Sequence, residues 1–292
     1  MSNMNENNNS EINNIHWYPG HMTKAKRMMQ ENIKLIDIVI ELLDARIPMS
    51  SKNPDIDELA KNKFRLVLLN KADLADPSVT AEWENYYKEK GFFVLCLDSR
   101  KNTGMKLITD KVKEVCREKI ERDKKRGIIG RPIRAMVAGI PNVGKSTFIN
   151  SYSKKAVAKV GNKPGVTRGK QWIRIDKNVE LLDTPGILWP KFEDKETGLR
   201  LSYIGSINDD ILAKSEIALL LIGYLKNNYC NTLADRYNIN IDKENFEILS
   251  DIAIIRKCLK KGNEPDLDKA ANLLLEDFRS GKLGRISLER PQ

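Results

Sequence analysis

One short segment of the sequence has the residue types and the spacing of a phosphate-binding loop. Residues 139–146 have the sequence GIPNVGKS and fit the pattern G-x-x-x-x-G-K-[ST]. Its glycines let backbone N–H groups turn towards phosphate oxygens, and its lysine can reach the β- and γ-phosphates of a nucleotide. Its serine hydroxyl can bind Mg²⁺. The predicted phosphate-binding residues are Asn142, Val143, Gly144, Lys145, Ser146 and Thr147.

A second segment carries the chemistry needed to recognise guanine. Residues 70–73 have the sequence NKAD and directly follow an apolar stretch, residues 65–69. The Asp73 carboxylate can accept hydrogen bonds from N1–H and the N2 amine of guanine, whereas adenine offers neither donor in that arrangement. Asn70 would tie the loop and contact the other edge of the base, and the Lys71 stem would cover the base face.

Five further positions complete a nucleotide site with magnesium in this interpretation. Thr167 offers a hydroxyl for the second Mg²⁺ position when a γ-phosphate is present. Asp183 would hold Mg²⁺ through water, and the N–H of Gly186 would bond the γ-phosphate. The backbone N–H groups of Asp98 and Ser99, after another apolar stretch, would face O6 of guanine.

Apolar stretches precede most of these loops and predict a parallel sheet that is covered on both faces. The expected strands are residues 37–44, 65–69, 92–97, 133–137, and a hairpin of 171–176 with 179–182. The expected helices between them are residues 23–33, 55–62, 78–90, 106–125 and one that starts at 146. The fold class is therefore α/β, with helices on both faces of a mostly parallel sheet.

The chain from about residue 187 onwards has mostly helical patterns. Candidate helices are residues 197–204, 206–212, 213–227, 243–261 and 267–280. We therefore expect a disordered tail at 1–14, a GTP-binding α/β domain at 15–190 and an all-α domain at 191–292.

The order of the motifs is unusual. In a standard small G protein the phosphate-binding loop comes first and the base-binding loop follows it. Here Asp73 precedes Lys145, and no N-K-x-D follows Gly186. The chain would have to pass through the strands of the same sheet from a different starting strand, as in a circular permutation. Such a rearrangement is tolerated where the termini lie close together at the surface.

The composition favours an anionic partner. The net charge is +10 and the pI is about 9.3, which suggests nucleic acid first. Residues 111–134 hold 10 Lys/Arg against 4 Asp/Glu, which indicates either a solvated helix face or a phosphate-facing patch. Residues 205–292 are nearly neutral, with 13 Lys/Arg against 14 Asp/Glu. Scattered cysteines without a C-x-x-C pair are typical of a reduced, cytosolic protein, and no apolar run is long enough for a membrane span.

With these motifs in this order the chain resembles the circularly permuted GTPases of ribosome assembly. The motifs that carry the resemblance are residues 17–22 (WYPGHM), 44–48 (DARIP), 70–73, 139–146, 164–167 (PGVT) and 183–186 (DTPG). The resemblance implies a cytoplasmic GTPase that uses Mg²⁺ and acts in maturation of the large ribosomal subunit. It also implies contact with ribosomal RNA through a helical C-terminal domain. We expect neither DNA nor a membrane to be a partner. Asp98 departs from the Asn expected at its position.

The catalytic step has a gap in this sequence. Small G proteins often orient the attacking water with a Gln just after D-x-x-G, but here Ile187 and Leu188 stand there. The resemblance offers His21 as the residue that orients water, beside Lys145 as the other catalytic residue; His21 is otherwise a structural or RNA-contacting residue. Asn142 resembles the asparagine that binds K⁺ in related GTPases, or it simply forms the turn.

Two other functions fit the same residues. One is a P-loop ATPase or kinase, against which the guanine-selecting Asp73 argues. The other is a nucleotide-gated scaffold that binds the ribosome or its RNA and turns over GTP only incidentally. The absence of Gln after D-x-x-G fits that second function.

Overall fold

The structure is a computed structural model, and it describes residues 20–101, 104–154, 171–184, 195–207 and 213–292. The chain forms two compact units. The first comprises the residues up to Glu193 together with Ser287–Gln292, and the second is Asp194–Ile286. The division predicted from the sequence stays a prediction, and these units differ from it because the last residues of the chain cluster with the first unit.

The first unit is built on a six-stranded sheet with the spatial order β3-β2-β1-β4-β6-β5. All neighbouring pairs are parallel except β5 with β6, which form the predicted antiparallel hairpin. Every residue of β1 is buried, as expected for a central strand covered on both faces. The strands are β1 (Ile38–Asp44), β2 (Phe64–Asn70), β3 (Phe93–Cys96), β4 (Ile133–Ala138), β5 (Gln171–Arg174) and β6 (Val179–Asp183).

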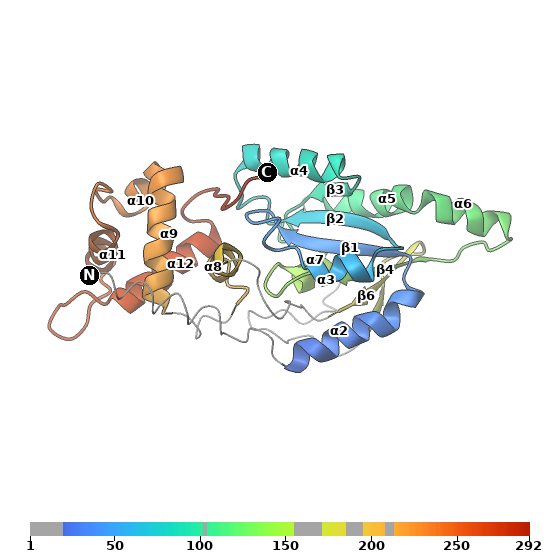
Figure 1. Cartoon of the computed structure of the whole chain (residues 1–292), viewed down its shortest axis with the longest axis horizontal. Coiled ribbons are helices and arrows are strands. Elements are labelled where there is room, and N and C mark those ends of the chain that lie inside the picture. The colour runs from blue at the N-terminus through green and yellow to red at the C-terminus, as the bar shows by residue number, and fades with distance from the viewer. Residues whose placement is uncertain (1–19, 102–103, 155–170, 185–194, 208–212) are drawn as a thin grey trace. The chain divides into compact units, whose positions relative to one another are not determined.

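Helices connect the strands of this sheet, and two of them carry clear start signals. The Asn53 side chain caps α3, the Asp76 side chain caps α4, and each helix then begins with Pro. In Figure 1, α4 and α5 lie beside β3, whereas α2 lies on the other side of the sheet. The helices are α2 (Gly20–Asn32), α3 (Pro54–Leu59), α4 (Pro77–Glu89), α5 (Met105–Val115), α6 (Arg117–Lys125) and α7 (Lys145–Ser153), with a short 3₁₀ turn at Ile33–Leu35.

The long helix predicted at residues 106–125 is wrong, because the chain forms α5 and α6 with a break at Cys116. Helix α5 buries an apolar stripe that ends at Val115. Helix α6 is polar on nearly all sides: it buries only Lys119, whose Nζ lies 3.6 Å from Oδ1 of Asp37, and it packs no apolar stripe against the sheet. It projects beyond the end of the sheet in Figure 1.

The second unit is helical. Helix α9 is its centre, since α8, α10, α11 and α12 all pack against it. Sequence patterns missed α10, and part of the predicted helix 206–212 lies outside the described residues. No helix of the described residues is both long and apolar enough to cross a membrane. The helices are α8 (Lys195–Tyr203), α9 (Lys214–Asn228), α10 (Cys230–Tyr237), α11 (Asn245–Ile255) and α12 (Leu267–Ser280).

Candidate guanine-nucleotide site

The predicted nucleotide-binding loops share one edge of the sheet. Strands β1, β2, β3, β4 and β6 are parallel, so the loops after their carboxyl ends emerge on the same side. From β1 the chain proceeds to β2 and β3 in one direction, and from β4 to β6 in the other. Ligands of such sheets bind where the strand order reverses, which here is between β1 and β4.

The phosphate-binding loop lies between β4 and α7, as predicted, and its glycines are required by close contacts. Gly144 has φ +96°, and a Cβ there would lie 2.5 Å from Nδ2 of Asn70. A Cβ on Gly139 would lie 2.8 Å from the carbonyl oxygen of Leu42. Asn142 has φ +60°, a left-handed conformation that Asn tolerates, so forming the turn already accounts for its presence.

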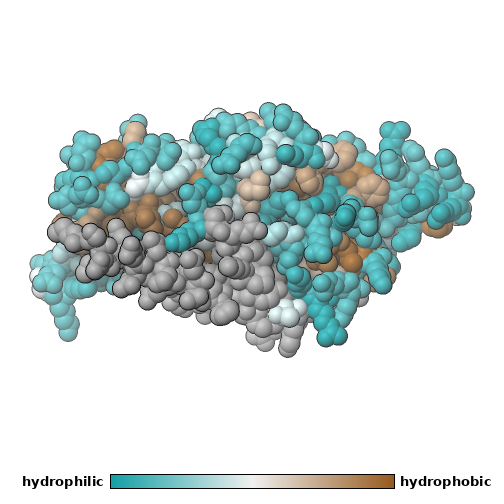
Figure 2. Space-filling model, in the orientation of Figure 1, coloured by the Kyte–Doolittle hydropathy of each residue, from teal (hydrophilic) through white to brown (hydrophobic). Residues whose placement is uncertain are grey.

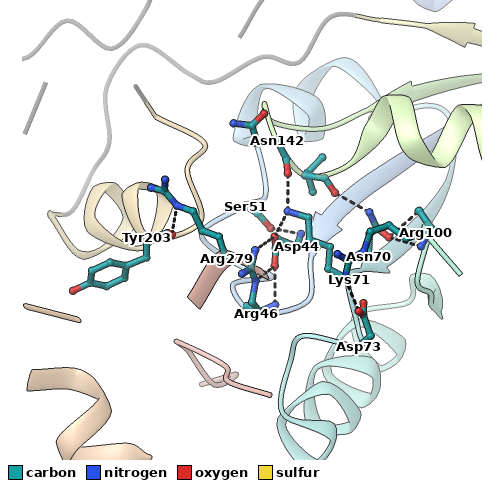
Figure 3. Close-up of polar contacts among 12 residues, drawn as sticks. Asp44, Arg46, Ser51, Asn70, Lys71, Asp73, Arg100, Asn142, Tyr203 and Arg279 are labelled. Atoms are coloured by element: carbon teal, nitrogen blue, oxygen red, sulfur yellow. Dashed lines mark hydrogen bonds and ion pairs between the residues drawn. The ribbon is translucent and has the colours of Figure 1, made fainter. Parts of the chain in front are cut away.

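Asn70 joins three of the predicted loops (Figure 3). Its Nδ2 donates to the carbonyl of Val143 at 2.8 Å. Its Oδ1 accepts from the backbone N of Ser99 at 3.2 Å and from the Ser99 hydroxyl at 2.8 Å. The side chain is buried, so these bonds are shielded from water. These bonds therefore tie the base-binding loop to the phosphate-binding loop within the protein itself.

Lys71 makes a second tie between the same loops. Its Nζ donates to the carbonyl of Asn142 at 2.7 Å and lies 3.0 Å from Oδ2 of Asp44. Burial lowers the pKa of Lys71, and the carboxylate of Asp44 opposes that change. The Lys71 amine is thus hydrogen-bonded to the phosphate-binding loop. The packing of the Lys71 stem on a base stays a prediction.

Asp73 is held by a residue that the sequence analysis did not identify. Nη2 of Arg100 donates to Oδ2 of Asp73 at 2.8 Å (Figure 3). The other oxygen, Oδ1, is buried and accepts no hydrogen bond within the described part of the chain. An unpaired buried carboxylate oxygen is costly, so it fits a group that awaits a donor from a ligand. The position of Arg100, directly after the predicted pair at 98–99, was the one available signal.

Asp98 shapes its own turn. Its Oδ1 accepts from the backbone N of Arg100 at 2.9 Å and of Lys101 at 3.4 Å. Asn could make the same bonds, so the departure from the family residue leaves this turn intact. The Oδ2 of Asp98 is buried and has no hydrogen-bond partner among the residues described.

Lys145 and Asp183 meet where the phosphates would bind. Nζ of Lys145 lies 3.3 Å from Oδ1 of Asp183 and donates to the carbonyl of Thr184. Burial lowers the pKa of Lys145, and Asp183 opposes that shift. The Thr184 hydroxyl donates to the carbonyl of Val137 at 2.6 Å, which fixes the end of β6 beside β4.

The oxygen donors at this position fit Mg²⁺. Ser146 follows Lys145 in the first turn of α7, and the Asp183 carboxylate ends β6. A hydroxyl and a carboxylate are hard donors, and Mg²⁺ usually takes only one or two protein ligands beside phosphates and water. No cluster of three or more His, Cys, Asp or Glu that could hold another kind of metal occurs among the described residues.

Three predicted site residues are not tested by this geometry. Thr167 and Gly186 lie outside the described residues. His21 lies in the first turn of α2, but its side chain is outside the description. Their roles stay predictions.

Comparison with known proteins decides the family. A family profile described as "50S ribosome-binding GTPase" matches residues 134–254. A Bacillus cereus protein named ribosome biogenesis GTPase A is 48% identical over 95% of this chain and 94% of its own length. This chain belongs to the ribosome biogenesis GTPase A family. A Thermotoga maritima member with the same name is 32% identical over 94% of both chains.

Solved structures agree with this family. The GDP-bound structure of TM YlqF has a TM-score of 0.69 at 27% identity, and the alignment covers 91% of this chain and 99% of that one. The structure of GNP-bound YlqF from T. maritima has a TM-score of 0.66 at 28% identity, and the alignment covers 92% of this chain and 99% of that one. The chain is therefore a GTPase with a P-loop α/β domain and a helical C-terminal region, and the ribosome-assembly GTPase family inferred from its motifs is confirmed.

Proposed function

We propose that this GTPase is a cytoplasmic assembly factor for the large (50S) ribosomal subunit. In this proposal it binds the subunit through ribosomal RNA and uses GTP hydrolysis as a maturation or release switch. The observation that carries the proposal is the 48% identity to a named ribosome biogenesis GTPase over 95% of the chain. The "50S ribosome-binding" description of the matching family supports the choice of the large subunit.

The residues of the site divide the work of binding GTP. Asp73 binds guanine, with Asn70 and Lys71 fixing its loop, and the turn of Asp98 and Ser99 closes the base site. Lys145 and the N-terminus of α7 hold the phosphates, since a helix N-terminus favours anions. When bound, Mg²⁺ supplies charge neutralisation at the β- and γ-phosphates, and its proposed ligands are Ser146, Thr167 and Asp183.

We infer a circular permutation from the order of these elements. The base-binding loop follows β2, whereas the phosphate-binding loop follows β4, later in the chain. The segment after Asp183 then leads directly into the helical unit that starts at Asp194. Loss of the γ-phosphate contact at Gly186 would act on the helical unit with few intermediate elements. His21 orients the attacking water in this proposal, and K⁺ at Asn142 would assist it.

A basic projection on the GTPase unit fits ribosomal RNA. Helix α6 and the residues after it extend from the sheet, and that end is mostly hydrophilic in Figure 2. Within the described residues, these exposed cations make no salt bridge: Arg122, Lys124, Lys125 and Arg126. Ile129 beside them is 89% exposed. Unpaired cations on a projection favour phosphate contact over a merely solvated helix face.

The test compares GTP hydrolysis with and without large ribosomal subunits, across a salt series. Subunits should accelerate the wild type strongly. Lys124→Glu with Lys125→Glu should reduce that acceleration, and the salt dependence of binding should fall by about one unit of slope per lost phosphate contact. Basal hydrolysis should not change, because neither lysine is near the nucleotide loops.

A control reverses two exposed lysines elsewhere on the same unit, Lys88 in the last turn of α4 and Lys90, the residue that caps that helix. The control should behave as the wild type. Equal loss in both pairs would show a general charge effect and remove α6 as the RNA surface. If subunits do not accelerate the wild type at all, the scaffold function, which the missing Gln favours, replaces the assembly GTPase.

A further inference from the structure

The motif at residues 44–48 (DARIP) has no place among the nucleotide contacts, yet it forms a buried ionic cluster. Asp44 ends β1, and its carboxylate accepts from Arg46 at 3.1 Å (N), 2.9 Å (Nε) and 2.8 Å (Nη2). Both side chains are 1% exposed or less. Burial alone would raise the pKa of Asp44, but Arg46 and Lys71 lower it far below its usual range. Asp44 is therefore a fixed anion, and Lys71 is fixed against it.

The loop that follows this cluster is held by the C-terminal segment of the chain. Oε1 of Glu289 accepts from the backbone N of Met49 at 2.5 Å and of Ser50 at 3.0 Å. Its Oε2 accepts from the Ser50 hydroxyl at 2.5 Å. The N–H of Leu288 donates to the carbonyl of Arg46 at 2.9 Å. Glu289 is 8% exposed, so one buried carboxylate organises the turn after the DARIP motif.

These contacts form one continuous path to the phosphate-binding loop. The backbone N of Asp44 donates to the Ser51 hydroxyl at 3.0 Å, which joins the turn held by Glu289 to the ionic cluster. Asp44 then contacts Lys71, whose amine donates to the carbonyl of Asn142. Figure 3 shows the portion from Ser51 to Asn142.

Glu289 lies just after the helical unit in the sequence. The helical unit ends at Ile286, and Ser287–Gln292 clusters with the GTPase unit. Both ends of the helical unit are therefore joined along the chain to segments of the GTPase unit. The N-terminal end follows the predicted γ-phosphate contact at residue 186. The C-terminal end leads to Leu288 and Glu289, which hydrogen-bond to the segment 46–50.

We propose that Glu289 is a positioning residue of the guanine-nucleotide site. It holds the turn at residues 49–51 so that Asp44 keeps Lys71 on the phosphate-binding loop, and this slows release of GDP. The inference rests on the proposed nucleotide site. A merely structural Glu289 would fasten the end of the chain and affect stability, but it would leave nucleotide kinetics unchanged.

The test measures dissociation of a fluorescent GDP analogue from the full-length protein, together with urea unfolding. Glu289→Ala removes three accepted hydrogen bonds, and Glu289→Gln keeps the shape but turns one oxygen into a donor that faces other donors. Both should speed GDP release about three- to tenfold, as expected for loss of buried, charge-assisted bonds. Arg290→Ala is the control, because its ion pair with Glu82 is exposed and should leave release unchanged.

A second variant tests the path itself. Ser51→Ala removes the bond to the N–H of Asp44 and should also speed release. Combined with Glu289→Ala it should speed release by less than the product of the two single effects, since both act through the same turn. If Glu289→Ala fails to fold, Glu289→Gln and Ser51→Ala carry the measurement.

The possible failures can be told apart with Lys145→Ala. If that variant keeps its GDP affinity, the proposed site itself is wrong. If it loses GDP binding while the Glu289 variants are less stable but release GDP normally, only the positioning role is refuted. Multiplicative effects in the double variant would also refute the path.

Discussion

Replacement of Asp73 by Asn tests base recognition directly, because the structure leaves one of its carboxylate oxygens ready for a ligand. Oδ2 accepts from Arg100, and Oδ1 is buried without a hydrogen bond from any residue described. Each carboxylate oxygen can accept two hydrogen bonds. The side chain can therefore serve N1–H and the N2 amine of guanine while Arg100 stays in contact.

The expected loss can be worked from these contacts. In Asp73→Asn the amide oxygen can still accept from N1–H, but the amide nitrogen faces the N2 amine of guanine, donor against donor. Loss of one charge-assisted bond, with a donor left unpaired, costs about 2–4 kcal/mol. That corresponds to roughly 30- to 700-fold weaker binding of GDP. Xanthine has a carbonyl in place of the N2 amine, so the variant should bind xanthosine diphosphate more tightly than GDP.

Arg100→Ala is the matched control, since both variants lose the Arg100–Asp73 ion pair but only Asp73→Asn changes the groups that face the base. The Arg100 side chain is 56% exposed. Exposed pairs contribute about 1 kcal/mol or less, so this variant should bind GDP within roughly fivefold of the wild type. It should gain no preference for xanthosine diphosphate.

The assay is competition of GDP, xanthosine diphosphate and ADP against a fluorescent GDP analogue. A variant Asp73→Asn that still prefers GDP would show that Asp73 does not contact the base. An equal loss in Arg100→Ala would show that the ion pair, and not the base contact, controls affinity. Tight ADP binding by the wild type would contradict guanine selection altogether.

Three further changes test other parts of the molecule. His21→Ala should lower GTP turnover but not GTP affinity; full turnover with ribosomal subunits would exclude His21 as the water-orienting residue. Gly144→Ala should weaken GDP binding and lower stability by about 1–3 kcal/mol, because a Cβ at φ +96° would lie 2.5 Å from Asn70 Nδ2; urea unfolding and GDP titration check this. Asp277→Asn should destabilise the helical unit by about 2–4 kcal/mol at pH 7, since Arg236 donates to Asp277 at 2.8 Å. Burial raises the pKa of Asp277 but its basic partners lower it below the usual value, so the difference between wild type and variant in urea should shrink as the pH falls below about 4, where the wild-type carboxylate also takes up a proton.

The sequence predicted the strands and the P-loop well because their signals are local. An apolar run before a loop of glycines marks a buried parallel strand, and β1, β2 and β4 all lie within one residue of the predicted ends. The break at Cys116 was missed because charge and helix propensity continue across it. Only the structure shows that the buried apolar side chains end at Cys116 and that α6 buries nothing beyond Lys119.

The contacts that hold the site together could not be predicted in the same way. Arg100 with Asp73, and Asp44 with Lys71, join residues from different loops. Such pairs are set by how the strands align, which no local pattern contains. The motif at residues 44–48 could be recognised from the sequence, but its physical role as the anion that fixes Lys71 required the structure.

The ties between loops imply that base and phosphate binding are coupled in this protein. Asn70 contacts Val143, and Lys71 contacts Asn142, so a shift of the base-binding loop must move the carbonyls of the phosphate-binding loop. Both contacts are made to backbone carbonyls and not to the N–H groups of that loop, which are the groups suited to bind phosphate oxygens. Loss of either tie should therefore weaken binding of inorganic pyrophosphate, a ligand with no base, as well as GDP. Weaker GDP binding with unchanged pyrophosphate binding in Asn70→Ala would show that the two loops act independently.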